Sequence, residues 1–486
     1  MKLLTYSRIS LKLICTIALF TCNLISKEQE RPNFIFLMAD DLGYGDTGFN
    51  GNKIIKTPHL DNMAKEGARF THFYSIGPVC APTRGSALTG RHYMRYGMMD
   101  VNVGKLPHQE ITIARLCKQQ GYTTGHFGKW HLGTLSKIES PRHKNPAKDF
   151  APPWERDYDD AFATEISVPT WDPAAGRYPK HDSPYWHNGQ KVTDNLLGDD
   201  SRVIMDRAIP FIRKAVTDKK SFMTTIWFHT PHSPVVAGPE YLKMYEGYKE
   251  GEQHYYGCIT AMDEQIGRLR EELRKLNVDQ NTIIWFCSDN GPEGRGNPKK
   301  KYDAYHGAFY GTAGKLRGRK RSLYNGGVCV PALVSWPGKI DAGKVINTPC
   351  STLDYLESTL AQMNVKYPDS RPLDGENIIP ILLGKTNKRN KPIIFASKIS
   401  SPKTSIIQGD YKFCSNLDGK NKDELYHLHD DFSESKNIIK NHQERSITMK
   451  KMIYQWLESC NKSFHGNDYK EKYEVQGSFL KYNQAN

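Results

Sequence analysis

Four short, almost entirely apolar segments are spaced along the chain, and each leads directly into polar or turn-forming residues. The segments are NFIFLM, MTTIWF, TIIWFC and VPALVSW, at residues 33–38, 223–228, 282–287 and 330–336. Segments of this length that are apolar on both sides are typical of strands buried in a parallel sheet. Helix-period segments lie between them, at residues 57–68 and 259–276. The alternation predicts an α/β fold, with a mixed or parallel sheet sandwiched by helices.

The pattern changes near residue 371. The segments PIIFASK, TSIIQGDYKFCS and ELYHLHDD are shorter and more alternating, and a helical pattern follows at residues 446–460. We therefore expect a larger domain at residues 31–370 and a smaller C-terminal subdomain at residues 371–486, with an antiparallel sheet and a packed helix. Residues 139–184 are rich in Pro, Asp, Tyr and Lys. They predict long loops, which commonly carry substrate selectivity on α/β scaffolds.

Residues 1–26 have the pattern of an export signal. Basic residues precede the apolar run LICTIALF, and polar residues follow it. The run is too short for a comfortable membrane span. We expect an exported protein, periplasmic or secreted. Cys22 loosely resembles a lipoprotein site, so a lipoprotein of the periplasm or cell surface is the alternative, and a membrane is expected as a partner only in that case.

The formal net charge of the chain is +14. A basic balance of this size indicates an anionic partner, such as nucleic acid, an acidic membrane surface or an acidic polymer, or else a basic surface kept for solubility. An exported chain seldom meets nucleic acid, so we expect none as a partner. The cysteines after residue 26 lack the close spacing of a zinc site. Cys287 lies in an apolar run and is expected to be a buried small hydrophobe.

Acidic and amide residues follow two of the apolar segments. Asp40 and Asp41 come after the first segment, and Asp289 and Asn290 come after the third. In α/β sheets, ligands bind beyond the carboxyl ends of the strands. Oxygen-only donors suit calcium or magnesium rather than zinc. A turn or helix cap would explain Asp40 and Asp41 alone, but the second pair at an equivalent strand end favours a metal site.

The segment VCAPTRGSALTGR, at residues 79–91, carries the most specific motif. Cys-x-Pro-x-Arg followed by Leu-Thr-Gly-Arg resembles the signature of the type I, formylglycine-dependent sulfatases. The resemblance continues, in the family's order, through ADDLGYGD, TPHLDNMAKEGARFTHFY, GYTTGHFGKWHLG, TPHSP, FCSDNGPEG and LRGRKRSLYNGG. It covers nearly the whole mature chain. It implies an alkaline-phosphatase-like fold, a catalytic sulfatase domain at residues 31–370 and sulfuric ester hydrolase activity.

The resemblance also implies roles, position by position. One Ca²⁺ ion would be held by Asp40, Asp41, Asp289 and Asn290 and would touch the formylglycine that a separate formylglycine-generating enzyme makes from Cys80. Arg84 and Lys129 would stabilise the hydrate of this aldehyde, and His131 would be its base. One hydroxyl of the hydrate would attack sulfur, and deprotonation of the other would expel sulfate. Lys129, His232 and Lys320 would bind the sulfate. His232 and Lys320 would also protonate the leaving oxygen.

Some positions retain alternatives. His229 could take the role of His232, although the Pro-His-x-Pro context favours His232. Lys320 lies in a basic run, and Lys315 is its weaker rival. Many members of the family carry Glu where this chain has Asn325. We expect this difference to remove a carboxylate near the catalytic lysine and to alter the orientation or pKa of that lysine.

The substrate is the least constrained part of the prediction. The overall pattern resembles bacterial polysaccharide sulfatases, which favours a sulfated carbohydrate of the ulvan or carrageenan type. One alternative is a phosphonate or phosphate monoester hydrolase of the same superfamily, because the two kinds of ester share geometry. An alternative of another class is a polyanion-binding protein without activity, since residues 295–321 interleave basic and aromatic side chains.

Overall fold

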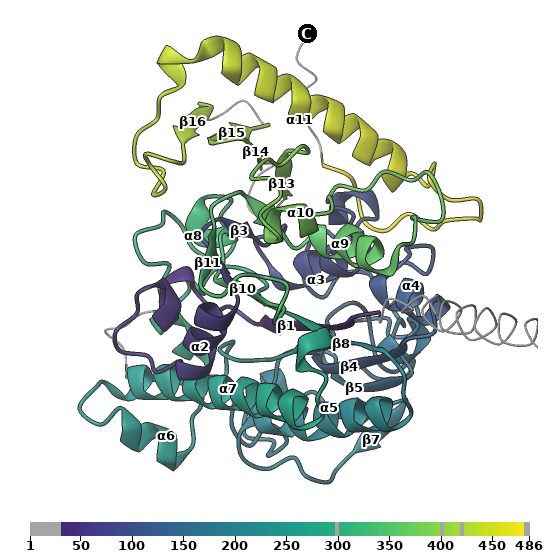
Figure 1. Cartoon of the computed structure of the whole chain (residues 1–486), viewed down its shortest axis with the longest axis vertical. Helices are drawn as coiled ribbons and strands as arrows, with labels where there is room; N and C mark the ends of the chain where they lie inside the picture. The colour runs from purple at the N-terminus through teal and green to yellow at the C-terminus, as the bar shows by residue number, and fades with distance from the viewer. Residues whose placement is uncertain (1–30, 297–300, 399–402, 418–421, 481–486) are drawn as a thin grey trace, which may run out of the picture.

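The computed structural model describes residues 31–296, 301–398, 403–417 and 422–480. The expected signal peptide, Cys22 included, lies outside these residues. A ten-stranded sheet runs through the molecule in the order β11-β2-β10-β9-β1-β8-β4-β5-β6-β7 (Figure 1). Its strands are β1 (Asn33–Ala39), β2 (Ala68–Phe70), β4 (Thr123–Lys129), β5 (Asp160–Thr164), β6 (Tyr185–His187), β7 (Gln190–Val192), β8 (Phe222–Trp227), β9 (Thr282–Ser288), β10 (Ala332–Ser335) and β11 (Lys344–Ile346). A small separate pair joins β3 (Phe73–Tyr74) to β12 (Cys350–Ser351).

The centre of the sheet is parallel, as the apolar segments predict. β1 pairs in parallel with β8 and β9, and β4 pairs in parallel with β8 and β5. Successive residues of β1 enter opposite cores: Phe34 and Phe36 pack on one face, Ile35 and Leu37 on the other. Burial of both faces explains why these strands read as continuous apolar runs. The fourth segment also forms a strand, β10, but it is antiparallel to β9, so its carboxyl end lies at the opposite edge.

Helices cover both faces of the sheet (Figure 1). One face carries α2 (Pro58–Glu66), α5 (Asp200–Thr217), α6 (Pro239–Met244) and α7 (Glu250–Lys275). The other carries α3 (Cys80–Thr89), α4 (Ile113–Gln119), α9 (Asp354–Met363) and α10 (Ile379–Leu382), and the short α8 (Asn325–Val328) precedes β10. Short 3-10 helices are η1 (Tyr44–Asp46), η2 (Gly48–Asn50), η3 (Tyr93–Arg95), η4 (Pro153–Glu155), η5 (Pro179–His181), η6 (Asp279–Asn281), η7 (Ala304–Tyr310) and η8 (Ile439–Asn441). The helices predicted at residues 57–68 and 259–276 are therefore α2 and α7, although α7 begins earlier.

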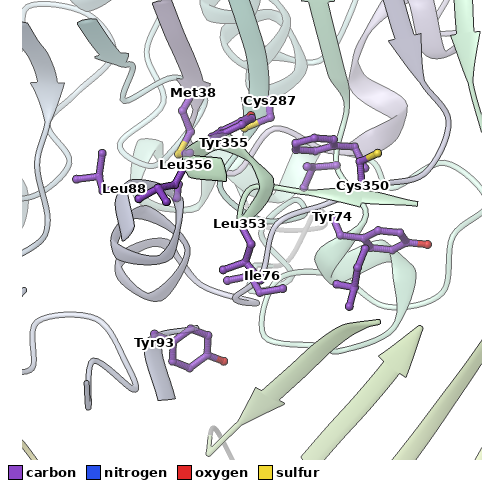
Figure 2. Packing of buried hydrophobic residues seen from close by; sticks show 14 of the residues in the cluster. Met38, Tyr74, Ile76, Leu88, Tyr93, Cys287, Cys350, Leu353, Tyr355 and Leu356 are labelled. Carbon is purple, nitrogen blue, oxygen red and sulfur yellow. The ribbon is translucent and has the colours of Figure 1, made fainter. Parts of the chain in front are cut away.

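The hydrophobic core beneath α3 and α9 holds α3, which begins at Cys80, against the sheet. Figure 2 shows Met38 of β1 beside Leu88 of α3 and Leu356 of α9. The ring of Tyr355 lies 5.1 Å from that of Trp285 in β9. These apolar contacts fix α3 against the sheet, and they thereby fix the position of its first residue at the sheet edge.

The C-terminal part forms the expected antiparallel sheet. Its strands are β13 (Ile393–Ser397), β14 (Lys403–Gln408), β15 (Tyr411–Asn416) and β16 (Glu424–His427), each antiparallel to the next. The long helix α11 (Gln443–Phe464) packs across β14 and β15 at the outside of the molecule (Figure 1). The alternating pattern and the helical pattern at residues 446–460 thus predict this unit correctly.

Residues 139–184 contain the expected loops, but β5 lies among them. Its sequence, DAFAT, is too short to stand out by periodicity. In the part of the chain that the structure describes, no helix combines the length and the apolar character needed to cross a membrane. All eight cysteines in this part are free thiols, and Cys287 is fully buried as predicted.

Candidate active site

The carboxyl ends of four parallel strands bring polar residues to one edge of the sheet. Asp40 and Asp41 follow β1, Asp289 follows β9, and Lys129 is the last residue of β4. The turn after β8 carries His232. These residues are far apart in the sequence, and they meet because parallel strands end at the same edge.

Acidic side chains converge at the centre of this edge. Within the part of the chain that the structure describes, one set of potential ligand atoms, all within 4.8 Å of one another, comes from Asp40, Asp41, Cys80 and His232. Asp289 adjoins the set, since its Oδ1 accepts a hydrogen bond of 3.2 Å from the Asp41 amide. The Oδ1 atom of Asn290 is buried and has no hydrogen-bond partner among the described residues, while its Nδ2 donates to Asp41. Three carboxylates and an unpartnered amide oxygen fit a hard divalent cation such as Ca²⁺.

Basic side chains compensate the buried carboxylates. Lys129 Nζ lies 2.5 Å from Asp40 Oδ2, and Arg84 NH2 lies 2.7 Å from Asp289 Oδ2. Burial alone would raise the pKa of Asp40, but Lys129 and the neighbouring cations hold it well below its ordinary value. Burial, followed by repulsion from Asp40, raises the pKa of Asp289 to about 6. The carboxylates therefore still repel one another, which a bound divalent cation would relieve.

Lys320 reaches the same cluster from the loop before α8. Its Nζ lies 2.5 and 2.8 Å from the two carboxylate oxygens of Asp41. Burial opposes the charge of Lys320, but Asp41 and the neighbouring acidic groups together raise the pKa of the ammonium above its ordinary value. Lys320 is therefore a charged proton carrier at neutral pH.

Cys80 is the first residue of α3, and its side chain faces the acidic cluster. Its Sγ lies 3.5 Å from Asp40 Oδ1 and 3.7 Å from Lys320 Nζ. Burial, together with Asp289 and Asp40, raises the pKa of the thiol above its ordinary value. An unmodified Cys80 would be a protonated thiol at neutral pH, and a thiol is a poor nucleophile.

Two histidines border the space above Cys80, and both are poised as neutral acceptors. His131 has a left-handed backbone (φ 59°), and its Nε2 lies 3.0 Å from Asn102 Oδ1. Since an amide oxygen only accepts, Nε2 carries the proton, and Nδ1 is buried without a partner among the described residues. Burial, then Lys129, lowers the pKa of His131 well below its ordinary value. Nδ1 is thus free to accept a proton.

The ring of His232 is oriented in the same way. Its Nδ1 lies 2.6 Å from the carbonyl oxygen of Ser233, to which it donates. Its Nε2 lies 3.8 Å from Asp41 Oδ2 and faces the cluster. Burial lowers the pKa of His232 below its ordinary value, although Asp40 and Asp41 oppose the shift.

A cavity of about 260 Å³ opens above these groups. Among the predicted site residues, it is lined by Cys80, Lys129, His131, His232 and Lys320. The other predicted residues are buried beside or beneath them: Asp40, Asp41, Arg84, Asp289 and Asn290. A hollow with a divalent-cation site at its floor and basic groups on its walls can hold a tetrahedral anion and neutralise its charge.

Comparison with known proteins identifies the family. The profile described as Sulfatase matches residues 32–365 of the chain. The chain belongs to the sulfatase family. A second profile, N-sulphoglucosamine sulphohydrolase, C-terminal, matches residues 318–462. The sulfatase is therefore a sulfuric ester hydrolase, and the fold is the alkaline-phosphatase-like fold that the resemblance implies.

Individual relatives agree with this assignment. The sulfatase is 30% identical over 390 residues to N-acetylgalactosamine-6-sulfatase of Homo sapiens. This alignment covers 76% of this chain and 69% of the relative. It is 28% identical to arylsulfatase G of Mus musculus, with 78% of this chain and 74% of the relative covered. Among solved structures, Ps i-CgsB in complex with k-i-k-neocarrahexaose matches with a TM-score of 0.75 and 27% identity, covering 88% of this chain and 93% of the other.

The two rival residues of the sulfatase lie outside the cavity. His229 is fully buried, and its ring nitrogens contact Asp200 Oδ2 at 2.8 Å and Thr164 Oγ1 at 2.6 Å. It has no nitrogen left for a substrate. Lys315 is exposed and does not line the cavity. The geometry therefore favours His232 and Lys320.

The side chain of Asn325 contacts the C-terminal part of the chain rather than Lys320. Asn325 Nδ2 donates to the carbonyl of Phe432, and its Oδ1 accepts from Lys412. No hydrogen bond joins it to Lys320 among the described residues. The motif places Asn325 near Lys320 in sequence, but α8 turns the side chain toward the C-terminal sheet.

Several residues that line the cavity of the sulfatase escaped the sequence analysis. They are Asp100, Asn102, Arg142, Ser167, His181, Arg295 and Arg321. Arg142 and His181 fall within residues 139–184, where loops were expected, and two arginines fall in the basic segment at 295–321. The loop-forming and basic composition of these two segments is the only indication that the sequence gives for these residues. No local pattern marks Asn102, which orients His131.

Proposed function

We propose that the sulfatase removes sulfate from a sulfated carbohydrate, using a formylglycine made from Cys80 and one Ca²⁺ ion. The observation that carries the proposal is the cavity with Cys80 at its floor, Lys129 and Lys320 on its walls, and an acidic cluster beneath. A sulfate monoester is surrounded by negative oxygens, so cleavage requires groups that neutralise charge as it develops on the leaving oxygen.

The metal would be held by the residues at the ends of β1 and β9. Asp40, Asp41 and Asp289 would supply carboxylate oxygens, and Asn290 would supply its unpartnered Oδ1. When bound, the ion would draw charge from the sulfate oxygens and from the group at position 80. Lys129 and Lys320 lie on two of these carboxylates, so they neutralise the cluster from the cavity side.

The residues around position 80 suit a hydrated aldehyde. Formylglycine, once hydrated, supplies two hydroxyls on one carbon, one to attack sulfur and one to release sulfate. Lys129 and Arg84 place positive charge beside this carbon, since both contact carboxylates next to Cys80. His131 offers the unpartnered Nδ1 as a proton acceptor, and Asn102 fixes the tautomer that leaves this atom free. His131 would therefore serve as the base.

Lys320 and His232 would act on the sulfate and its leaving oxygen. Lys320 is protonated at neutral pH because Asp41 raises its pKa. His232, with its lowered pKa, is neutral and presents Nε2 to the cavity. We therefore assign the proton that the leaving oxygen receives to Lys320, which would also bind the sulfate. His232 would bind the sulfate once its Nε2 has taken up a proton, because sulfate oxygens only accept hydrogen bonds.

Charge and kinship support a sulfated carbohydrate. The human relative is an N-acetylgalactosamine-6-sulfatase, and the matched structure contains a neocarrahexaose. The net charge of +14 suits an anionic polymer. Within this class we favour an algal polysaccharide or its oligosaccharides, of the ulvan or carrageenan type.

Maturation and location complete the proposal. Cys80 is 1% exposed, so a formylglycine-generating enzyme would reach it before the chain folds. We propose export to the periplasm or outside the cell, directed by residues 1–26, with lipid anchoring at Cys22 as the alternative. We also propose that residues 31–370 are the catalytic domain and residues 371–486 the C-terminal subdomain.

Sulfate release from a panel of glycans tests the proposal. The panel holds ulvan, carrageenan, agaran, fucoidan and heparan fragments, and the protein is co-expressed with a formylglycine-generating enzyme. Release that Cys80→Ala abolishes is the expected result. An aryl sulfate, an aryl phosphate and an aryl phosphonate ester are compared in parallel. Faster turnover of the phosphorus esters would favour the phosphonate or phosphate ester hydrolase, and glycan binding without any turnover would favour the polyanion-binding protein.

A further inference from the structure

Two arginines at the mouth of the cavity have no carboxylate partner among the residues that the structure describes. Arg142 belongs to the connection between β4 and β5, and Arg295 follows β9. Both are exposed, and both line the cavity above Cys80. The guanidinium of Arg142 donates only to the backbone carbonyl of Lys180, and the side chain of Arg295 makes no hydrogen bond or ion pair with a described residue.

The cations deeper in the cavity differ from these two, because each of them lies against a carboxylate. The pairs are Lys129 with Asp40, Lys320 with Asp41 and Arg321 with Glu293. Arg321 contacts both oxygens of its partner, at 2.5 and 2.9 Å. The proposed metal and sulfate groups account for the first two pairs, and Glu293 accounts for Arg321. Arg142 and Arg295 therefore remain as positive charge that the sulfate chemistry does not use.

The remaining titratable groups of the lining do not cancel this charge. Asp100 is exposed and forms no ion pair with either arginine among the described contacts. His181 contacts Ser167, and burial, followed by repulsion from His232, lowers its pKa to about 3. His181 is thus neutral at pH 7 and adds no positive charge. The excess at the mouth comes from the two guanidinium groups.

We propose that Arg142 and Arg295 form a subsite for a second anionic group, a carboxylate or a second sulfate, on the sugar that carries the scissile sulfate. This inference rests on the proposed function and specifies its substrate class. Planar guanidinium groups bind carboxylate and sulfate oxygens through paired hydrogen bonds. The cavity, at about 260 Å³, is slightly smaller than the usual ligand pocket of about 300–1,000 Å³. This volume suits one sugar unit, so the second anion lies on the unit that carries the scissile sulfate.

Calorimetry on a protein that cannot turn over its ligand isolates the subsite. Cys80→Ser protein is titrated, with calcium present, with galactose 2-sulfate, galactose 2,6-disulfate and galacturonic acid 2-sulfate, which differ only at C6. The corresponding glucose series covers the other configuration at C4. We expect the second anion to tighten binding by roughly 10- to 100-fold in at least one series, as charge-assisted hydrogen bonds do. The C6 group that gives the larger gain in affinity shows whether the subsite prefers a carboxylate or a sulfate.

Substitution of the two arginines measures how much they contribute to the tighter binding of the doubly anionic sugar. Adding Arg142→Gln and Arg295→Gln to the Cys80→Ser protein should reduce the affinity ratio of doubly to singly anionic sugar to within about 3-fold of one. Arg213→Gln is the matched control, since Arg213 is an exposed arginine of α5 paired with Glu272, and it should keep the full ratio. Circular dichroism verifies that each variant folds.

The outcomes separate the subsite from the proposed function. A ratio near one in both series, or a ratio that survives the double substitution, overturns the subsite. Hydrolysis of 4-nitrophenyl sulfate by mature wild-type protein, which carries a single anion, tests sulfatase chemistry independently. A protein that hydrolyses the aryl sulfate but shows no gain from a second anion would remain a sulfatase without this subsite.

Discussion

Lys412 and Glu434 form a buried ion pair beside the loop that carries Lys320. Lys412 Nζ lies 2.8 Å from Glu434 Oε1, and neither side chain is exposed to solvent. The other oxygen of Glu434 accepts a hydrogen bond from the amide of Asn325. Lys412 also donates to the Oδ1 of Asn325. The C-terminal sheet is thereby fastened to the start of α8, five residues after Lys320.

This arrangement accounts for a neutral side chain at position 325. Glu434 already supplies a carboxylate to Lys412, and Asn325 supplies an amide oxygen. We expect Asn325→Glu to bring a second carboxylate against one lysine and to lower the free energy of unfolding by about 3 kcal/mol or more, because a buried charge is then uncompensated. Urea denaturation measures the change.

Two further variants make this prediction specific. Asn325→Glu combined with Glu434→Gln should recover stability to within about 1.5 kcal/mol of wild type, because one carboxylate again faces Lys412. Asn325→Gln, which has the size of glutamate without its charge, should cost less than Asn325→Glu. If Asn325→Glu and Asn325→Gln were equally destabilising, the size of the side chain rather than its charge would be responsible. The inference that Glu434 takes the place of a carboxylate at position 325 would then be refuted.

The two histidines of the turn after β8 should behave differently when replaced. His232 faces the cavity, so we expect His232→Asn to lower kcat by roughly 10²- to 10⁴-fold with little change in stability. His229 is held by Asp200 and Thr164, so His229→Asn should lower the free energy of unfolding by about 1–3 kcal/mol, because buried partners lose their hydrogen bonds. Aryl sulfate turnover and urea denaturation separate the two effects. The reverse pattern would assign the catalytic role to His229.

Calcium removal should reduce both activity and stability. Without the ion, Asp40, Asp41 and Asp289 repel one another in a buried space. We expect EGTA to abolish turnover and to lower Tm, with a stabilisation of about 2.7 kcal/mol when calcium is present at 100 times its Kd. Asp41→Asn should weaken calcium binding. Asp218→Asn, at an exposed ion pair with Lys214, is the control and should not. Activity and Tm that are unchanged by EGTA would argue against a metal at this cluster.

The sequence predicts the parallel strands β1, β8 and β9 because burial on both faces leaves continuous apolar runs. It does not predict β4, whose sequence TTGHFGK contains two glycines and a histidine. Only the tertiary structure explains that histidine: His126 packs edge-on against Trp130 and Trp227 and contacts Thr225 of β8. Local pattern gives no indication of such an aromatic enclosure.

The same contrast holds at the site. Because ligands bind beyond the carboxyl ends of parallel strands, the sequence alone suffices to place Asp40 and Asp289 at one edge of the sheet. The partner of Asn325, in contrast, is Glu434, which is 109 residues later in the chain. Arg142 and Arg295 come from separate loops, and both line the cavity. Their presence at one cavity depends on the path of those loops, which periodicity does not encode.

The enclosed His126 makes the stability of the protein sensitive to acid. Burial, followed by repulsion from Arg84, lowers the pKa of His126 to about 3, and its Nε2 has no partner among the described residues. The unfolded chain binds this proton near pH 6.5, whereas the folded protein does not until about pH 3. Below pH 6.5 the unfolded state therefore binds more protons, so stability is lost as the pH falls, by about 1.4 kcal/mol per pH unit for this one group.

His126→Gln should flatten the profile of unfolding free energy between pH 7 and 4.5 by that slope, whatever its effect at pH 7. His465→Gln, at the exposed end of α11, is the control for removing a histidine and should leave the profile parallel to that of wild type. Because the slope rather than the absolute stability is compared, a His126→Gln profile parallel to that of wild type would show that folding does not lower the pKa of His126.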